Sequence, residues 1–238
     1  MNKEEFINEL KHLDINISVD TLKKLDTYYH LLVTENAKYN LTTITEESAV
    51  YLKHFYDSLT IVKSINLKDE YLLDIGSGAG FPGLVLKIVF PELKVDLLDS
   101  TAKKCHFLEK VITELDLKNI HVICARAEDY AQDNREKYDI ITSRAVAPLK
   151  HLLEYAIPLL KIGGTFVSLK GNITEELNNI DNYYKKLYLA NESIINFNLP
   201  HEAGYRTIYK ITKTKPTPKI YPRSYSQIKK EISKTLEK

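Results

Sequence analysis

A chain of 238 residues, of which 44% are hydrophobic and 27% charged, has the composition of a globular protein with a sizeable core. No apolar run approaches the roughly 20 residues that span a bilayer, and the charged N-terminus lacks the apolar centre of a signal peptide. Two cysteines, Cys105 and Cys124, form neither a disulfide framework nor the spacing of a zinc site. We therefore expect a cytoplasmic protein without a membrane span and without a metal.

The formal net charge of +1 hides an uneven distribution. Residues 205–238 contain ten Lys or Arg and two Asp or Glu, which gives this segment +8 and leaves −7 for the rest. A basic tail on an acidic body favours a polyanionic partner. A solvated tail that binds nothing explains the same charge equally well.

Residues 1–66 are expected to form a small N-terminal helical cap. Apolar residues recur at helical spacing over 6–13 and 22–33, with Asp20 as a cap before the second run. The pattern breaks at residues 40–43 and resumes over 46–56.

Residues 67–238 are expected to form a second domain, in which strands and helices alternate, followed by the basic tail. Apolar runs predict strands at 71–76, 95–99, 121–125, 138–143 and 165–171, with further β-like stretches at 194–197 and 207–212. Helical patterns lie between them at 81–90, 101–115, 151–160 and 175–189. This order predicts an α/β fold with a mostly parallel, seven-stranded sheet and helices on both of its faces.

A glycine-rich loop follows the first predicted strand, where open α/β sheets bind nucleotides. Asp74, Gly76, Gly78 and Gly80 satisfy the D-x-G-x-G-x-G pattern of S-adenosylmethionine sites, although an overlapping G-x-G-x-x-G also fits a dinucleotide. A carboxylate at Asp74 can help to hold the cationic amino-acid end of S-adenosylmethionine, which a dinucleotide lacks. The loop therefore favours S-adenosylmethionine.

Two further acidic residues follow the next strands at the same edge of the sheet. Asp99, nineteen residues after Gly80, can accept hydrogen bonds from a ribose diol. Glu128 follows the third strand, where methyltransferases commonly hold the adenine. Strand, turn, helix and two distant acids thus agree with a nucleoside-containing cofactor.

The residues after the fourth strand narrow the acceptor chemistry. Residues 142–148 lack the Asn/Asp-Pro-Pro-aromatic motif of enzymes that methylate exocyclic amines. Methylation of a pyrimidine carbon needs a cysteine nucleophile, but Cys105 and Cys124 fall inside a helix and a strand and are interpreted as core thiols. A ring nitrogen or an oxygen remains, and guanine N7 needs no general base because nothing must be deprotonated.

Several motifs, in order along nearly the whole chain, resemble one bacterial family, the 16S ribosomal RNA guanine-N7 methyltransferases (RsmG, formerly GidB). They are Asn40-Leu41-Thr42, His54-Phe55-Tyr56-Asp57-Ser58, the loop from Asp74 to Gly83, Asp99-Ser100, Lys103-Lys104, Phe107-Leu108, Arg126-Ala127-Glu128, Ser143-Arg144-Ala145-Val146-Ala147, Lys170-Gly171 and Tyr221-Pro222-Arg223. The resemblance implies a Rossmann-like methyltransferase fold, S-adenosylmethionine as cofactor, and 16S ribosomal RNA or the small subunit as partner of a monomer.

The resemblance also implies the site residues. The cofactor is expected to contact the loop including Phe81, together with Asp99, Ser100, Ala127, Glu128 and Arg144. Arg144 is expected at the reaction face, where it positions the acceptor without acting as a base. The residues expected to face the RNA are His54, Lys170, Arg206, Lys219 and Arg223.

Alternatives remain open for these residues and for the function. Arg144 could form a structural ion pair, His54 and Asp57 could merely pack the cap, and Lys170 could be a plain surface lysine. An RNA-binding Rossmann protein without catalysis and a methyltransferase acting on a small molecule are the competing functions.

Overall fold

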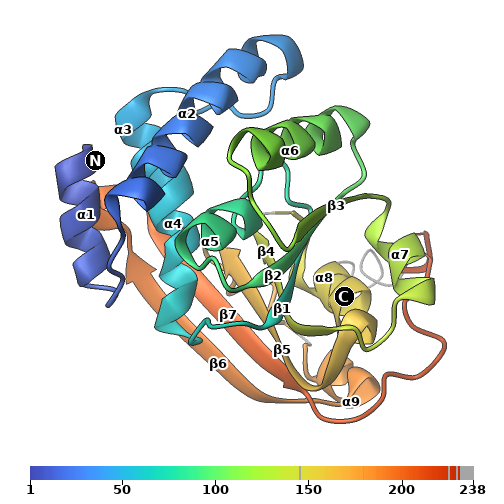
Figure 1. Cartoon of the computed structure of the whole chain (residues 1–238). Coiled ribbons are helices and arrows are strands. Elements are labelled where there is room, and N and C mark those ends of the chain that lie inside the picture. The colour runs from blue at the N-terminus through green and yellow to red at the C-terminus, as the bar shows by residue number, and fades with distance from the viewer. Residues whose placement is uncertain (145, 179, 225, 229, 231–238) are drawn as a thin grey trace.

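The fold is described from a computed structural model that covers every residue except 145, 179, 225, 229 and 231–238, so the end of the basic tail lies outside the described residues. A seven-stranded sheet runs through the molecule, and helices cover both of its faces (Figure 1). Among the described residues, no helix has the length and apolar character needed to cross a membrane.

The N-terminal segment is helical, as the spacing of its apolar residues predicts. Its elements are α1 (Lys3–Lys11), α2 (Val19–Tyr39), α3 (Glu47–Val50), the π-helix η1 (Tyr51–Tyr56), α4 (Asp57–Leu59) and the 3₁₀-helix η2 (Thr60–Lys63). The cap of α2 is Ser18, whose hydroxyl accepts from the backbone N–H of Thr21, and Asp20 lies in the first turn. The prediction that Asp20 caps this helix is therefore wrong by two residues, because the Ser18 hydroxyl already satisfies the free N–H of Thr21.

The strands occur in the spatial order β3-β2-β1-β4-β5-β7-β6. They are β1 (Tyr71–Ile75), β2 (Lys94–Asp99), β3 (Ile120–Cys124), β4 (Tyr138–Arg144), β5 (Leu160–Lys170), β6 (Leu189–Asn198) and β7 (Tyr205–Lys213). The first five pair in parallel, whereas β7 is antiparallel to both β5 and β6. The carboxyl ends of β1 to β5 and the beginning of β7 consequently share one edge, called here the carboxyl edge.

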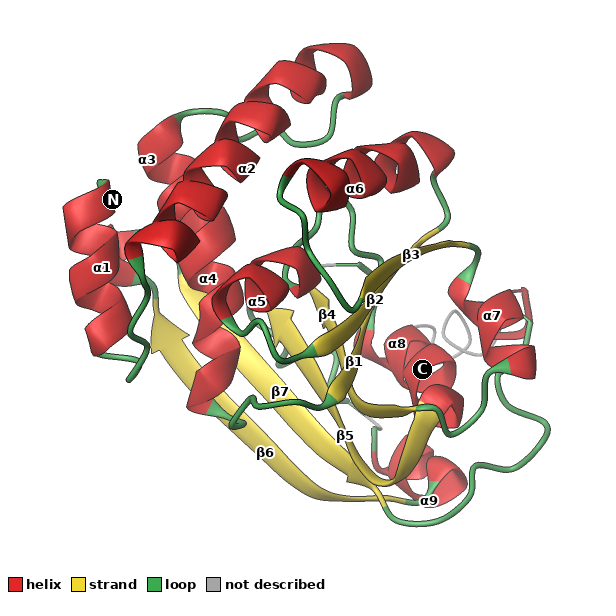
Figure 2. Cartoon of the chain, viewed as in Figure 1, coloured by secondary structure: helices red, strands yellow, loops and turns green. Residues whose placement is uncertain are grey.

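The remaining helices lie on the two faces of the sheet (Figure 2). They are α5 (Gly83–Val89), α6 (Ala102–Glu114), α7 (Ala127–Asp133), α8 (Leu149–Leu159), α9 (Asp181–Leu187) and the short 3₁₀-helix η3 (Pro200–Glu202). Successive strand residues alternate between two buried clusters, with Leu72 facing α5 and the cap and Leu73 facing α8. The first cluster is continuous from Phe6 in α1 to Val95 in β2, so the cap shares its core with the sheet.

The region between β5 and β6 differs from the sequence prediction. A helix was expected over residues 175–189, but α9 spans only Asp181–Leu187. It ends at Tyr188, whose left-handed backbone (φ 56°) turns the chain, and Leu189 then pairs with Lys213 as β6 begins. Edge pairing along β7 therefore overrides the helical periodicity of the last residues.

The segment after β7 returns along α7 and α8 instead of extending into solvent. The guanidinium of Arg135 donates to the carbonyl oxygens of Thr217 (2.6 Å) and Tyr221 (2.6 Å). Further along, Arg223 pairs with the fully buried carboxylate of Glu154 on α8. Ion pairs and backbone contacts thus hold residues 217–223 against the body.

Candidate functional site

A cavity of about 510 Å³ opens at the carboxyl edge and follows the ends of β3, β2, β1 and β4. Among its lining residues are ten positions singled out from the sequence: His54, Gly76, Gly78, Phe81, Asp99, Ser100, Ala127, Glu128, Arg144 and the loop residue Ser77. Residues that are far apart in the chain therefore meet because parallel strands end at one edge.

The loop after β1 brings its backbone close to this cavity. Gly76 has φ +71°, and a Cβ built there would lie 2.6 Å from the Cγ atoms of Val146. Gly78 has φ +59°, and the nearest atom to a Cβ built there is the carbonyl oxygen of Gly76 at 3.9 Å. Left-handed backbone explains why glycine occupies both positions, and close approach is a second reason at Gly76.

Asp74 and Gly80 are not among the residues that line the cavity. Asp74 is fully buried beneath the loop, where its Oδ2 accepts the backbone N–H of Gly83 at 2.9 Å. A Cβ at Gly80 would lie 2.5 Å from the hydroxyl of Tyr28, which donates to the carbonyl of Ala79. The Asp74 carboxylate shapes the loop from below and does not line the cavity, so its expected contact with the cofactor stays a prediction.

Asp99 ends β2 and faces the cavity with most of its surface buried. Its Oδ2 accepts the N–H of Gly78 at 2.9 Å, and its Oδ1 accepts the N–H of Thr101 at 2.8 Å. Each carboxylate oxygen has a second lone pair, so both remain able to accept a ligand hydroxyl. The ammonium of Lys104 lies 3.8 Å from Oδ2 and adds positive charge beside the carboxylate.

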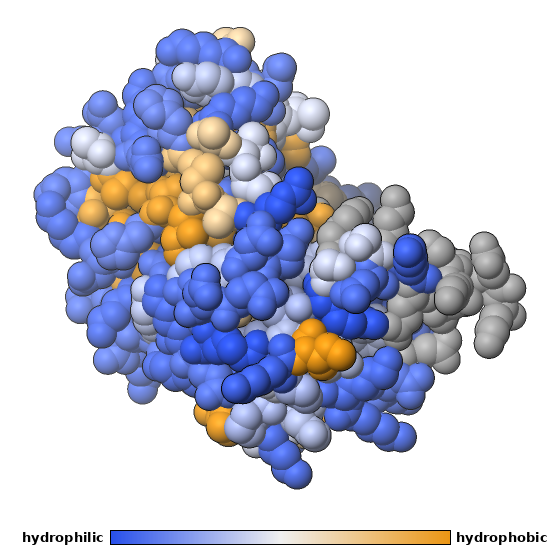
Figure 3. All heavy atoms as spheres, turned by 90° about the vertical axis from the view of Figure 1, so that its right-hand side faces the viewer, coloured by the Kyte–Doolittle hydropathy of each residue, from blue (hydrophilic) through white to orange (hydrophobic). Residues whose placement is uncertain are grey.

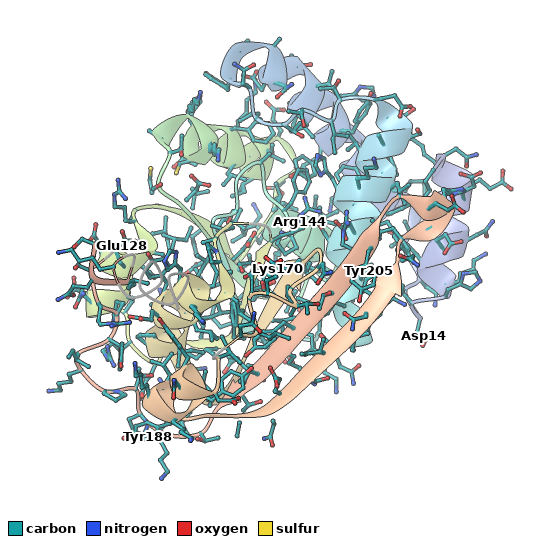
Figure 4. The ribbon with its side chains drawn as sticks, turned by 180° about the vertical axis from the view of Figure 1, so that it is seen from behind. Asp14, Glu128, Arg144, Lys170, Tyr188 and Tyr205 are labelled. Carbon is teal, nitrogen blue, oxygen red and sulfur yellow. The ribbon has the colours of Figure 1, made fainter. Side chains whose placement is uncertain are left out.

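The end of the cavity at β3 is formed by the first turn of α7. Ala127 and Glu128 line it, and the Glu128 carboxylate lies 3.7 Å from Arg126. Seen in Figure 4, Glu128 lies well away from Arg144, at the opposite end of the site. The face of the molecule that carries α7 is largely hydrophilic (Figure 3).

The other end of the cavity is walled by Arg144, His54 and Phe81. The imidazole of His54 stacks on Phe81 with ring centroids 4.3 Å apart, and the Arg144 guanidinium lies 4.9 Å from the same ring. Arg144 also donates to the Lys53 carbonyl (3.1 Å) and pairs with Asp57 (3.4 Å). Arg144 is thus both a lining residue and part of an ion pair that joins β4 to the cap.

A second, smaller chamber of about 320 Å³ lies on the far side of this wall. Its lining residues are Lys53, His54, Asp57, Arg144, Leu169, Lys170, Gly171 and Arg206. The Arg206 guanidinium donates to both oxygens of Asp57 (3.0 and 3.1 Å). Arg144 and Lys170 lie close together near the start of β7, marked by Tyr205 (Figure 4). Four cationic side chains and one buried carboxylate therefore surround this chamber, called here the basic chamber.

Lys170 is not the plain surface lysine that its sequence position allows. Its side chain is 8% exposed and its ammonium forms an ion pair with Glu176 at 2.7 Å and donates to the Ala147 carbonyl at 3.0 Å. Its charge contributes to the basic chamber, but its ammonium is already bonded.

The structure does not bring Lys219 and Arg223 to the site. Lys219 is exposed next to Pro218, in the segment that Arg135 holds at the opposite edge of the sheet. Arg223 is committed to Glu154, which is buried in α8. The path of the tail therefore separates these two residues from His54 and Lys170, and their expected contact with RNA stays a prediction.

Several residues of the quoted motifs line the cavity although the sequence assigned them no role there. They are Leu41, Thr42, Lys104 and Val146, and Thr101 and Tyr155 line it from outside the motifs. The position of Asn40-Leu41-Thr42 after α2 gave no indication of which strand it would face. Cys105 is buried as expected, whereas Cys124 is exposed, because β3 is the edge strand.

The lining residues fit a nucleoside-containing cofactor with a charged tail. The glycines permit close approach, the Asp99 carboxylate accepts hydroxyl donors, and the aromatic ring of Phe81 lies beside a guanidinium. Among the described residues, no group of three or more His, Cys, Asp or Glu side chains is placed to hold a metal ion.

The sequence of the chain is similar to that of one family of methyltransferases. Residues 21–203 match the family model GidB, rRNA small subunit methyltransferase G. Ribosomal RNA small subunit methyltransferase G of Acetivibrio thermocellus is 46% identical over 211 residues, covering 88% of this chain and 87% of the relative. The Staphylococcus carnosus protein of the same name is 43% identical, covering 94% and 95%.

Solved structures show the same fold at much lower identity. A methyltransferase from Pyrococcus furiosus aligns with a TM-score of 0.56 and 17% identity, covering 78% of this chain and 95% of that one. The TYW2 protein of M. jannaschii, solved in complex with AdoMet, aligns with a TM-score of 0.50 and 15% identity, covering 62% and 69%.

Proposed function

Because the chain belongs to the GidB family of small-subunit ribosomal RNA methyltransferases, we propose that it transfers a methyl group from S-adenosylmethionine to N7 of a guanine in 16S ribosomal RNA. The observation that carries this proposal is the wall formed by Arg144 and His54, which the cofactor cavity and the basic chamber share. A methyl donor on one side and an acceptor base on the other would meet there.

The order of the lining residues along the carboxyl edge supports one orientation of the cofactor. Ala127 and Glu128 would hold the adenine at the β3 end, and Asp99 would accept hydrogen bonds from the ribose after β2. The loop at Gly76 and Gly78 would then lie against the methionine portion, near Phe81. S-adenosylmethionine supplies an electrophilic methyl group at its sulfonium.

The basic chamber supports a nucleic-acid acceptor. Lys53, Arg144, Lys170 and Arg206 provide positive charge for phosphate, and a planar guanidinium can also hold a guanine edge. The N7 lone pair carries no proton, so the protein has to supply position and not a base. Holding two reactants in line contributes roughly 7–11 kcal/mol to lowering the barrier.

The competing functions are distinguished by the same features. An RNA-binding protein without catalysis has no need of a cofactor cavity built from four strand ends and the loops that follow them. A small-molecule methyltransferase has no need of a cationic chamber beside the methyl site. We further propose that the protein acts as a monomer, in the cytoplasm where the ribosomal subunit is found.

The test is methyl transfer from labelled S-adenosylmethionine to small ribosomal subunits isolated from a strain that lacks the gene, followed by mapping of the modified base. We expect Arg144→Ala to lower turnover on the order of 100-fold. We expect Arg144→Lys to restore little, because a point charge cannot replace a planar fork. The shape of the rate profile between pH 6 and pH 9 should not change.

The control is Lys118→Ala, a variant of an exposed residue in the turn before β3, which should retain wild-type turnover. Near-normal turnover of Arg144→Ala would remove Arg144 from the reaction. Label found on an exocyclic amine or on a small molecule would overturn the assignment to N7.

A further inference from the structure

The hydroxyl of Thr42 occupies a position at the cofactor cavity for which neither sequence nor family assigns a role. Its backbone N–H donates to the Asn36 side chain at 2.8 Å, which fixes the turn after α2. Its Oγ1 accepts the backbone N–H of Ile44 at 3.1 Å and lies 2.9 Å from Nε2 of His54. Thr42 also lines the cavity.

The protonation of His54 follows from its second neighbour. An Nη atom of Arg144 lies 3.1 Å from Nδ1 of His54, and a guanidinium can only donate. Nδ1 is therefore an acceptor without a proton. Burial, aided by the charge of Arg144, lowers the pKa of His54 to about 3, so the ring is neutral near pH 7. Its one N–H is then on Nε2 and is donated to Thr42.

The Thr42 hydroxyl is consequently the one donor in this chain of hydrogen bonds that still lacks an acceptor. A hydroxyl oxygen has two lone pairs and one hydrogen, and the N–H groups of Ile44 and His54 use both lone pairs. Among the described residues, none accepts a hydrogen bond from this hydroxyl when His54 donates to it. Since Thr42 lines the cavity, an acceptor on a bound ligand can receive it.

The position of Thr42 along the carboxyl edge identifies that acceptor. Thr42 bonds to His54, which stacks on Phe81 after β1 and contacts Arg144 at the end of β4. This is the end of the cavity away from Glu128, where the proposed function places the methionine portion. The ammonium of that portion only donates, and its carboxylate only accepts at neutral pH.

We infer that Thr42 is a cofactor-binding residue whose hydroxyl donates to the methionine carboxylate of S-adenosylmethionine. The inference rests on the proposed function for the identity of the ligand. It also links the two chambers, because a carboxylate at Thr42 favours the Nε2–H form of His54. That form leaves Nδ1 free to hold the guanidinium of Arg144 at the methyl site.

The experiment compares two ligands that differ only in the amino-acid portion. S-adenosylhomocysteine carries the carboxylate and 5′-methylthioadenosine lacks it. Calorimetry measures both ligands on wild type, Thr42→Val and Thr42→Ser. We expect Thr42→Val to weaken S-adenosylhomocysteine about tenfold or more, as for a hydrogen bond to a charged group, and to leave methylthioadenosine unchanged. Thr42→Ser should bind both ligands like wild type.

A second measurement is independent of binding strength. Nitrogen-15 spectra of the histidine rings should show His54 neutral at pH 5, with its proton on Nε2. The Nε2 resonance should shift on addition of S-adenosylhomocysteine and not on addition of methylthioadenosine. Protonation of His54 at pH 5, or a proton on Nδ1, would contradict the chain of bonds.

The outcomes separate this inference from the proposed function. Absence of S-adenosylhomocysteine binding to wild type would overturn the proposed function and the inference with it. Equal weakening of both ligands by Thr42→Val would show that Thr42 only supports the turn, and would overturn the inference alone. Unchanged binding of both ligands would do the same.

Discussion

At the scale of single residues, Asp74 carries an ionisable group that the fold isolates from water. Oδ2 accepts the N–H of Gly83, but Oδ1 has no hydrogen-bond partner among the described residues. Burial raises the pKa of Asp74 to about 7, and the bonds from Gly83 and Ser77 and the charge of Arg144 oppose the rise. The carboxyl group that defines the loop motif is thus a cost to the folded state when it ionises.

This cost predicts how stability changes with pH. The unfolded carboxyl ionises near its ordinary pKa of 3.8, whereas the folded one holds its proton until about pH 7. The folded state therefore loses stability as pH rises through this window. We expect Asp74→Asn, which keeps an oxygen acceptor for Gly83, to gain roughly 2–4 kcal/mol relative to wild type between pH 4 and pH 8.

The measurement is urea unfolding of wild type and Asp74→Asn across that range. Asp116→Asn is the control, because it makes the same chemical change at an exposed side chain. If the difference in the free energy of unfolding between Asp74→Asn and wild type did not change with pH, Asp74 would be ionised in the folded protein over the whole range.

The residues at the site differ in whether their positions could be predicted from the sequence. The glycines, Asp99 and Glu128 were predicted, because their positions relative to strand ends follow from the parallel sheet. The ion pairs of Asp57 with Arg144 and Arg206 were not predicted, because each joins elements that are distant in the chain. Asp57 in α4 is about ninety residues from Arg144 in β4 and about 150 from Arg206 in β7. Spacing along one element does not report contacts between distant elements.

At the scale of elements, the bounds of the central strands were predicted more accurately than those of the helix and strand between β5 and β7. Short apolar runs marked β1, β2 and β4 closely because both faces of these strands are largely buried. By contrast, β5 begins at Leu160, before its predicted start at residue 165. The helix expected over 175–189 was too long, since pairing of Leu189 with Lys213 takes its last residues into β6. The helical pattern over residues 46–56 gave no indication that Tyr51–Tyr56 would form a π-helix, in which His54 stacks on Phe81.

The segment after β7 was expected to be a basic tail, and its contacts with α8 give it a structural role. The Arg223 side chain is 17% exposed and pairs with Glu154, which is 0% exposed. Removal of one partner leaves a buried carboxylate uncompensated. We expect Arg223→Ala to lower the free energy of unfolding by about 3 kcal/mol.

Two variants test this role of the segment by urea unfolding. Lys219→Ala, which removes an equal charge from an exposed position four residues earlier, should change stability by less than about 0.5 kcal/mol. Adding Glu154→Gln to Arg223→Ala should recover part of the loss, because it removes the buried charge. Equal effects of Arg223→Ala and Lys219→Ala would show that the ion pair contributes nothing.

At the scale of the whole molecule, the positive charge is divided between two edges of the sheet. Lys53, Arg144, Lys170 and Arg206 surround the basic chamber at the carboxyl edge. Lys213 and Lys219 lie at the opposite edge, where Lys213 is bonded to the carbonyls of Ile157 and Leu160. A net charge of +1 for the whole chain therefore says little about where a polyanion binds.

The dependence of RNA binding on salt distinguishes the two edges. Each phosphate contacted by a cation contributes about −0.7 to the slope of log affinity against log salt for single-stranded RNA. Lys53 is exposed and lines the basic chamber, whereas Lys219 is exposed at the other edge. We expect Lys53→Glu to weaken RNA binding and to make the salt slope less steep by about one phosphate contact, while Lys219→Glu leaves the affinity and the slope nearly unchanged.

Because the two variants change the net charge equally, any difference between them reports position and not total charge. Titrations of a 16S ribosomal RNA fragment at several salt concentrations, with S-adenosylhomocysteine affinity as a check on the cofactor cavity, provide the measurement. A larger effect of Lys219→Glu would place the RNA along the tail and away from the carboxyl edge.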